Sequence, residues 1–142
     1  MNDLATIERL ESELLHLPQE SVPVTNKFAP GVYYREVFMK AGLFIIGKEH
    51  LTTHFNVVLS GRARVMMNGM VHDIRAPSTF ISKPGVRKIL YILEDMRWAT
   101  IHPTNLTDVT VLENTLVRNS NAFISYRERN MLMGEEIKCH LP

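Results

Sequence analysis

The sequence predicts an all-β domain of the barrel or sandwich type with a helix on either side of it. Between Val22 and His102, short runs rich in β-branched and aromatic residues alternate with turn residues at fairly regular intervals, which is typical of such domains. A helical pattern precedes this stretch and a second one follows it. The expected divisions are an N-terminal helix over 1–18, a barrel over 22–104, and a C-terminal helix and tail over 105–142.

The first segment has the spacing of an amphipathic helix. Asn2 or Asp3 can cap its start, and Pro18 fits a stop just beyond its end. Its apolar residues recur every three or four positions, at Leu4, Ile7, Leu10, Leu14 and Leu15. We expect this apolar stripe to lie on the barrel or, alternatively, to form a dimer contact, because it has to be covered.

The central stretch predicts a set of short strands separated by turns. Their expected ranges are 32–39, 41–46, 53–59, 62–67, 70–75, 79–82, 87–93 and 97–102. Turns are expected at Ser60-Gly61 and at Glu94-Asp95. The pair Asn68-Gly69 predicts a two-residue hairpin, because both central positions of that turn need a positive φ. A jelly-roll arrangement would protect most of the strand edges.

A second helix is predicted over 105–117, with Thr107 or Asp108 as its cap. Its expected apolar face consists of Val109, Leu112 and Leu116. The tail after residue 117 has weak periodicity, and one further strand is predicted there around Phe123, Ile124 and Tyr126.

Composition excludes several classes of protein. A net charge of +1 over 142 residues gives no general electrostatic reason to expect nucleic acid as a partner. Cys139 is the one cysteine, so neither an internal disulfide nor a zinc site of clustered cysteines is expected, and a reducing compartment is favoured. The N-terminus lacks the pattern of a secretory signal, and no apolar stretch approaches membrane-spanning length. We therefore expect a cytoplasmic protein without a membrane partner.

Polar side chains gather on one face of a predicted strand. Residues at even spacing along a strand point to the same side. That side, expected to be the barrel interior, carries Lys48, His50, His54, Asn56 and Val58. Buried polar groups cost free energy unless they have partners, so this face predicts a ligand pocket. Glu49 has the opposite parity and is expected outside.

The stretch GKEHLTTHFNVVLSGRARV, followed by KPGVRKILY, resembles the two motifs of the cupin superfamily. Those motifs contain two histidines, a glutamate and a glycine, then a Pro-Gly turn and a third histidine. Gly61, Pro84-Gly85 and the second histidine, His50, match. The other three ligand positions carry Lys48, His54 and Lys88. The resemblance covers about residues 40–104, and it implies a single cupin-type jelly-roll β-barrel.

The chain also resembles the small cupin-like proteins encoded by tailed bacteriophages. The residues that carry this resemblance are Gly47, His50, Thr52 or Thr53, His54, Asn56, Pro84, Gly85, Lys88, Trp98, Thr100 and His102. It implies a phage protein in the host cytoplasm. It also implies that Lys88 belongs to the pattern of this group, instead of marking the loss of the third cupin histidine in this chain alone. The activity of that group does not follow from the resemblance.

Two kinds of ligand suit the predicted pocket. Its expected residues are Lys48, His50, His54, Asn56, Lys88, Tyr91, Trp98 and His102. The two lysines favour an anion, either a phosphate or a carboxylate. Alternatively, His50, His54 and His102 could bind a divalent ion such as Zn, Fe, Ni or Mn, although a protonated lysine would repel it.

The arginines near the predicted strands are expected on solvated faces, and they are Arg62, Arg64, Arg75 and Arg87. Of these, Arg62 or Arg87 could add to an anion site at the barrel mouth. Tyr91 and Trp98 are expected in the core, with stacking on a ligand ring as the alternative.

Three functions remain open from the sequence. The first is a binding module for a small anionic molecule, for example a nucleotide signal of host defence. The second is a metal-dependent isomerase or oxygenase that uses the three histidines. The third is a structural or assembly protein of the phage particle. No catalytic nucleophile motif is present in the sequence, so a non-enzymatic role is favoured. A homo-oligomer is expected in each case, since the stripe over 4–15 and the tail offer surface to bury.

Overall fold

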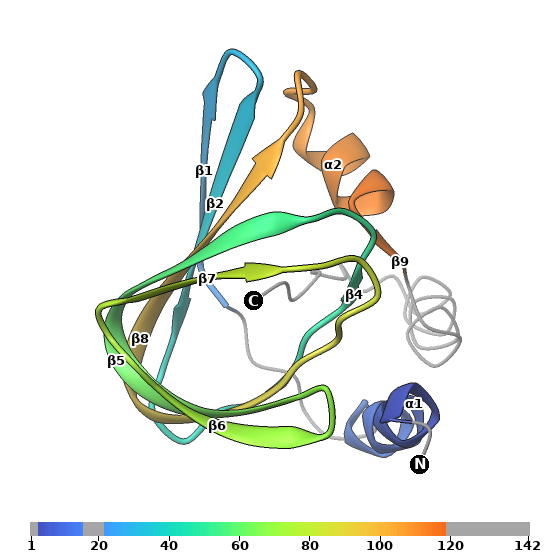
Figure 1. Ribbon diagram of the computed structural model, residues 1–142, viewed down its shortest axis with the longest axis vertical. Coiled ribbons are helices and arrows are strands. Elements are labelled where there is room, and N and C mark those ends of the chain that lie inside the picture. Colours follow the sequence, from blue (N-terminus) through green and yellow to red (C-terminus); the bar gives the residue numbers. More distant parts are fainter. Residues whose placement is uncertain (1–2, 16–21, 119–142) are drawn as a thin grey trace, which may run out of the picture.

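The computed structural model describes residues 3–15 and 22–118. The N-terminal half of these residues forms α1 (Asp3–Leu14), β1 (Val24–Ala29), β2 (Val32–Met39), β3 (Phe44–Ile46), β4 (Glu49–His50) and β5 (His54–Met67). The C-terminal half forms β6 (Met70–Arg75), β7 (Ser78–Ser82), β8 (Ile89–Pro103), α2 (Val109–Thr115) and β9 (Val117–Arg118). The predicted class, all-β with a helix on either side in sequence, is confirmed (Figure 1).

Two long antiparallel strands, β5 and β8, organise the barrel. The N-terminal half of β5 pairs with the C-terminal half of β8, for example Phe55 with Ile101, and on this side the strand order is β1-β2-β8-β5-β7. The C-terminal half of β5 pairs with the N-terminal half of β8, for example Val65 with Leu90, and on this side the strand order is β3-β8-β5-β6. Each long strand therefore belongs to both walls of the barrel, which Figure 1 shows as a continuous bend of β5 and β8.

The bend of β5 is located at Gly61. The register between β5 and β8 shifts between Val58 and Ala63, as expected where a bulge bends a strand without ending it. Gly61 has φ +91°, and a Cβ added there would lie 2.3 Å from the carbonyl oxygen of Asp95. The turns predicted at Ser60-Gly61 and Glu94-Asp95 are therefore wrong, because β5 and β8 run through them.

Other local predictions agree with the structure. Asn68 and Gly69 both have positive φ, 53° and 72°, and they join β5 to β6 as the predicted hairpin turn. The side chain of Asp108 accepts a hydrogen bond from the backbone N–H of Val111 and caps α2. The sequence missed β1, β4 and β9, of which β4 and β9 have only two residues each. The strand predicted around Phe123 lies outside the described residues.

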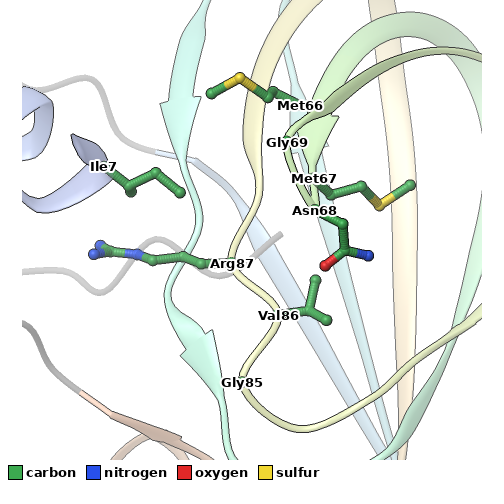
Figure 2. A pocket seen from close by; sticks show the side chains of 8 residues that line it. All are labelled: Ile7, Met66, Met67, Asn68, Gly69, Gly85, Val86 and Arg87. Carbon is green, nitrogen blue, oxygen red and sulfur yellow. The ribbon is translucent and has the colours of Figure 1, made fainter. Parts of the chain in front are cut away.

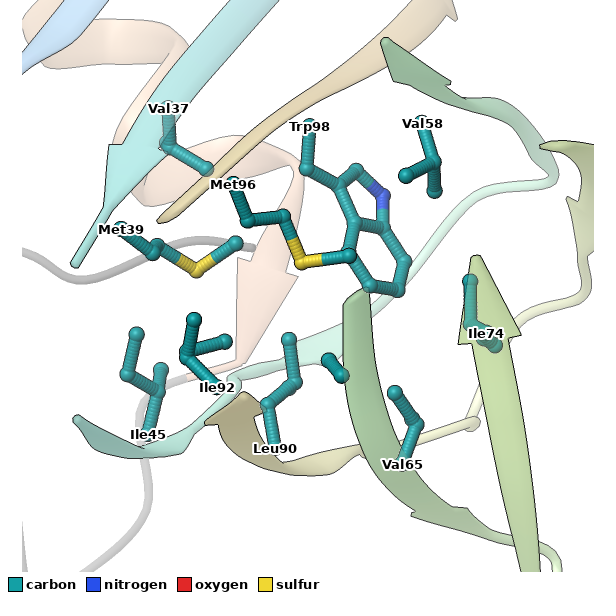
Figure 3. Close-up of a cluster of buried hydrophobic side chains, with 11 residues drawn as sticks. Val37, Met39, Ile45, Val58, Val65, Ile74, Leu90, Ile92, Met96 and Trp98 are labelled. Atoms are coloured by element: carbon teal, nitrogen blue, oxygen red, sulfur yellow. The ribbon is translucent and has the colours of Figure 1, made fainter. Parts of the chain in front are cut away.

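The apolar core fills one end of the barrel. Its inward side chains alternate along the strands, which gives β2 the burial pattern of a half-buried strand. Trp98 is fully buried at its centre and meets Phe80 edge to face. Figure 3 shows this cluster around Trp98. Its buried members are Val37, Met39, Ile45, Val58, Ala63, Val65, Ile74, Leu90, Ile92, Met96 and Trp98.

The two helices cover the barrel through a few specific contacts. In α1, Ile7 is buried and the buried carboxylate of Glu11 pairs with the guanidinium of Arg87. This corrects the expectation that Arg87 lies on a solvated face or adds to an anion site. Leu112 of α2 and Leu116, the residue that caps its C-terminal end, pack with Tyr33. The described residues contain no helix that is both long and apolar enough to span a membrane.

Candidate functional site

The barrel interior changes from apolar to polar along the strands. Next to the Trp98 level, the inward positions of three paired strands carry Arg35, Thr100 and Asn56. One level further, they carry Tyr33, His102 and His54, with Ser82 opposite His54. The inward face of these strands thus places a polar layer directly above the hydrophobic core. His50, Lys48 and Lys88 are buried as well, and of these His50 and Lys88 lie close enough to His54 to interact with it electrostatically.

Three buried histidines converge in this polar layer. His50, His54 and His102 are each at most 2% exposed, and they offer nitrogen atoms that all lie within 4.8 Å of one another. Their ring centroids are 4.3 Å apart for His50–His54, 4.8 Å for His54–His102 and 5.7 Å for His50–His102. Residues from β4, β5 and the end of β8 therefore meet at one point, although they are far apart in sequence.

Hydrogen bonds orient two of the three rings. His54 Nδ1 lies 3.1 Å from the carbonyl oxygen of Thr52, which can only accept, so Nδ1 carries the proton and Nε2 keeps its lone pair. His102 Nε2 lies 2.9 Å from the hydroxyl of Thr100, and its Nδ1 has no partner among the described residues. Outer hydrogen bonds of this kind fix the tautomer and orientation of metal-ligating histidines.

His50 has no hydrogen bond to either ring nitrogen within the described residues. Its position is set by the backbone instead. It pairs with Val117 of β9, and its carbonyl oxygen accepts a hydrogen bond from the N–H of Gly85. Together, the three histidines leave four buried ring nitrogens without partners among the described residues. Buried polar atoms in native proteins are rarely left in this state without a functional reason.

The environment keeps these imidazoles neutral. Burial, together with nearby positive charge, lowers the pKa of His54 to about 4 and that of His102 to about 3. Burial and then the charges of His54 and Lys88 hold the pKa of His50 well below its usual 6.5. A neutral imidazole has a free lone pair, which is the form that binds metal ions.

Both lysines of the predicted pocket are buried, and Lys88 acts electrostatically on the histidines. Lys88 is 2% exposed, and burial lowers its pKa to about 8, so the ammonium form still predominates at neutral pH. Its charge contributes to the lowered pKa of all three histidines. Lys48 is 4% exposed. Because β4 pairs with β9 and not with β5, the expected regular strand through Lys48, His50 and His54 is wrong.

Asn56 serves the fold at the boundary between the polar layer and the core. Its amide oxygen accepts a hydrogen bond from Trp98 Nε1 at 3.1 Å. Its amide nitrogen donates to Ser82 Oγ at 2.8 Å. Both ends of this predicted pocket residue are therefore occupied by the protein, and Trp98 belongs to the apolar core beneath the site.

Tyr91 does not join the site. It is 45% exposed and lies between two buried neighbours on β8, Leu90 and Ile92, so its side chain points away from the interior. The assignment of Tyr91 to the pocket is wrong for this reason of strand parity. Glu49, expected outside, is partly exposed and pairs with Arg118 at the surface.

Arg35, which was not predicted from the sequence, is 1% exposed in the same polar layer. Its Nη1 donates to Glu113 Oε1 at 3.1 Å and lies 3.4 Å from the hydroxyl of Tyr33. Its charge helps to lower the pKa of His50 and His102. Strand parity could have identified it, because Arg35 lies two residues from both Tyr33 and Val37 on a predicted strand and therefore shares their face.

A separate crevice lies between α1 and the barrel wall, and none of the histidines lines it (Figure 2). It is formed by Ile7 of α1, the β5–β6 hairpin at Met66–Gly69, and the segment Gly85–Arg87. The crevice carries no convergent set of titratable groups apart from Arg87, which is paired with Glu11.

Comparisons with known proteins bear on the fold. Neither family models nor curated proteins match this sequence. Among solved structures, a cupin superfamily protein of Desulfitobacterium hafniense matches with a TM-score of 0.52 and 11% identity, over 65% of this chain and 85% of its own. An RmlC-like cupin of Methanocaldococcus jannaschii, with a double-stranded β-helix fold, matches at 0.51 and 6% identity, over 61% and 84%.

The described chain has the cupin fold. A third match is the DMSP lyase DddQ of Ruegeria pomeroyi, with a TM-score of 0.52 and 14% identity over 61% of this chain and 49% of that one. At such identities the likeness concerns the cupin barrel and not its chemistry. Of the four ligand positions in the cupin motifs, the second histidine position carries His50 and the glutamate position carries His54, whereas His102 lies outside these four positions.

The histidine cluster of this cupin barrel fits a divalent transition metal. Imidazole nitrogens suit Zn, Fe and Ni, and tetrahedral zinc with bonds of about 2.1 Å would hold its ligands about 3.4 Å apart. The present nitrogen separations, up to 4.8 Å, leave only a small ring adjustment. None of the three ligands is charged, and Lys88 and Arg35 add positive charge nearby, so a bound cation would need an anion beside it.

Proposed function

We propose that this cupin binds a divalent transition metal through His50, His54 and His102 and uses it to hold a small anionic molecule inside the barrel. The observation that carries the proposal is the set of four buried, unpartnered ring nitrogens on these three histidines, within the described residues. A metal ion would give three of them the partner that they lack. The lowered pKa of each ring supports this, because protons compete weakly for those lone pairs at neutral pH.

The anionic part of the proposal rests on the charge balance of the site. Three neutral histidines leave the charge of a divalent ion uncompensated, and Lys88 places a buried ammonium nearby whose pKa is lowered by burial. Buried charges in proteins are normally paired. An anionic oxygen ligand would compensate the charges of the metal and of Lys88 together. A neutral molecule would leave these charges uncompensated, and a cationic one would add to the free-energy cost of burying them.

A metal with three protein ligands keeps coordination positions open for another molecule. When bound, it would act as a Lewis acid on an oxygen atom that occupies such a position. The protein's own residues would hold this molecule and exclude water from it. The isomerase or oxygenase hypothesis would use this same site, and it stays a prediction alongside the binding function.

Metal titration of a tag-free, chelator-treated protein tests the proposal. Calorimetry with Zn(II), Ni(II), Fe(II) and Mn(II) should show one ion bound per chain for at least one of these metals. The variants His54→Gln and His102→Gln should each lose this binding. His72→Gln is the matched control, because His72 lies on β6 outside the cluster, and it should bind like the parent. No uptake of any metal, or unchanged uptake by His54→Gln, would overturn the metal centre.

A metal-free anion pocket is the second candidate, and the buried Lys88 favours it. Measuring the binding of small anions to metal-free and metal-loaded protein separates the two. Equal affinity in both states, lost in Lys88→Met, would favour the metal-free pocket. Affinity that appears only with metal supports the metal-centred site.

The narrower hypotheses from the sequence remain predictions. They are a phage origin, a nucleotide signal as the ligand, a role in the phage particle, cytoplasmic location and a homo-oligomeric state. Binding of phosphorylated nucleotides that competes with simple anions would support the nucleotide hypothesis. Light scattering coupled to size-exclusion chromatography measures the oligomeric state directly.

A further inference from the structure

Arg35 is a buried cation whose guanidinium has hydrogen-bond partners on one side only, as far as the described residues are concerned. Nη1 donates to Glu113 Oε1 at 3.1 Å and to the hydroxyl oxygen of Tyr33 at 3.4 Å. Over the part of the chain that the structure describes, Nε and Nη2 are buried and have no hydrogen-bond partner. Buried donors on a charged group are expensive to leave unsatisfied, so these two atoms point to a missing acceptor.

The two free atoms form the edge of the guanidinium that can grip two oxygens at once. The N–H bonds of Nε and Nη2 lie side by side and match the two oxygens of a carboxylate. The same chain displays this arrangement at its surface. There, Arg62 donates from Nε to Asp73 Oδ1 at 2.9 Å and from Nη2 to Asp73 Oδ2 at 2.8 Å. Arg35 presents the same edge in the interior, with no carboxylate of the described chain on it.

This edge belongs to the polar layer that contains the histidines. Arg35 is paired across the sheet with Thr100, whose hydroxyl contacts the ring of His102. Tyr33, which meets Arg35 through its hydroxyl, stacks on His102 with ring centroids 5.7 Å apart. Arg35 also lowers the pKa of His50, so its charge reaches both sides of the cluster.

We propose that the Nε–Nη2 edge of Arg35 binds the carboxylate of a small organic acid, which makes Arg35 the residue that selects the ligand of this site. The inference rests on the proposed function, because the metal on the three histidines and the ammonium of Lys88 would bind other oxygens of the same molecule. Arg35 would orient the acid, and Glu113 would hold Arg35 in place through Nη1.

The observations favour a carboxylate over a phosphate. The free edge offers two parallel donors in one plane, which a planar group with two oxygens satisfies completely. A phosphate has further oxygens and up to two negative charges to desolvate in a fully buried site, and Glu113 already compensates part of the charge of Arg35. A carboxylate therefore leaves fewer polar atoms without partners.

Calorimetric titration with lactate, lactamide and inorganic phosphate tests this inference on metal-free and on metal-loaded protein. Lactamide matches lactate in size but lacks the second acceptor oxygen and the charge. Wild-type protein should bind lactate at least about tenfold more tightly than lactamide or phosphate, as the loss of a charged hydrogen bond implies. Arg35→Lys keeps the charge but loses the paired donors, and it should bind lactate at least about tenfold more weakly. Arg62→Lys should bind lactate like wild type.

The outcomes separate this inference from the proposed function. If metal uptake fails but lactate still binds in an Arg35-dependent way, the carboxylate site stands and the metal centre falls. If metal is bound but Arg35→Lys and wild type have the same affinity for lactate, the role of Arg35 is refuted. Tighter binding of phosphate than of lactate, or no saturable binding of lactate, also refutes it.

A measurement on wild type covers the case in which Arg35→Lys does not fold. The Nε–H signal of Arg35 in a ¹H–¹⁵N spectrum, assigned through its own side chain, reports the acceptor directly. Lactate should shift this signal and slow its exchange with water, and lactamide should do neither. An Nε–H signal that does not respond to lactate contradicts the proposal.

Discussion

Acidification should destabilise the metal-free protein through two histidines of the cluster. His54 and His102 have a pKa of about 4 and about 3 in the folded protein, chiefly because they are buried. In the unfolded chain their pKa returns to the ordinary 6.5. Between pH 6.5 and about 4, the unfolded chain therefore binds protons that the folded protein does not bind. The free energy of unfolding falls as the pH falls through this window.

The size of this effect follows from the two pKa values. Between pH 7.5 and 5.5 an unfolded histidine gains almost a full proton, and the folded ring gains almost none. The free energy of unfolding falls by about 1.3 kcal/mol for each histidine and by about 2.7 kcal/mol for the pair. This loss is a large fraction of the typical stability of a domain, about 5–15 kcal/mol.

Urea unfolding of chelator-treated protein at pH 7.5 and pH 5.5 measures this loss. His54→Gln and His102→Gln should each recover about 1.3 kcal/mol of the pH-dependent loss, whatever their stability at pH 7.5. His72→Gln should leave the loss unchanged. If all three variants lose as much stability as wild type between the two pH values, the two buried histidines are not neutral in the folded state and the reasoning is refuted.

Two further predictions concern the barrel itself. Gly61→Ala should lower the thermal stability more than Gly42→Ala. Both glycines have φ near +90°, a strain of about 1–2 kcal/mol for alanine, but only a Cβ at Gly61 would clash with backbone, at Asp95. Equal losses of stability in thermal unfolding would contradict the clash. Glu11→Gln should lower the free energy of unfolding in urea by about 3 kcal/mol, because it leaves the buried Arg87 without its charged partner. A loss below about 1 kcal/mol, as for an exposed ion pair, would contradict this role of Glu11.

Alternation and turn chemistry predicted much of the fold. The strands over 32–39 and 70–75 have the predicted ends, because each is bounded by turn residues that end the pairing. The ranges 53–59 and 62–67 are instead parts of one strand. A glycine that bends a strand through a bulge and a glycine that ends it look alike in sequence, since both supply a positive φ. Only the partner strand, here β8, decides between them.

The histidine cluster was only partly predictable for a similar reason. Parity placed His54 and Asn56 inside, but the meeting of His50 with His102 depends on the cross-strand register and on the pairing of β4 with β9. Long-range pairings of this kind leave no periodic signal in one sequence. Arg35 shows the opposite case: it was not predicted, although the alternation along 32–39 would have placed its side chain inside the barrel.

An anomalous difference map from crystals of metal-loaded protein would show whether the three histidines hold a metal ion. With data collected at the absorption edge of the bound metal, we expect one peak per chain at about 2.1 Å from a nitrogen of each of His50, His54 and His102. A map without a peak among these three rings, in crystals whose metal content has been verified by their absorption edge, would show that the histidines are not the metal site.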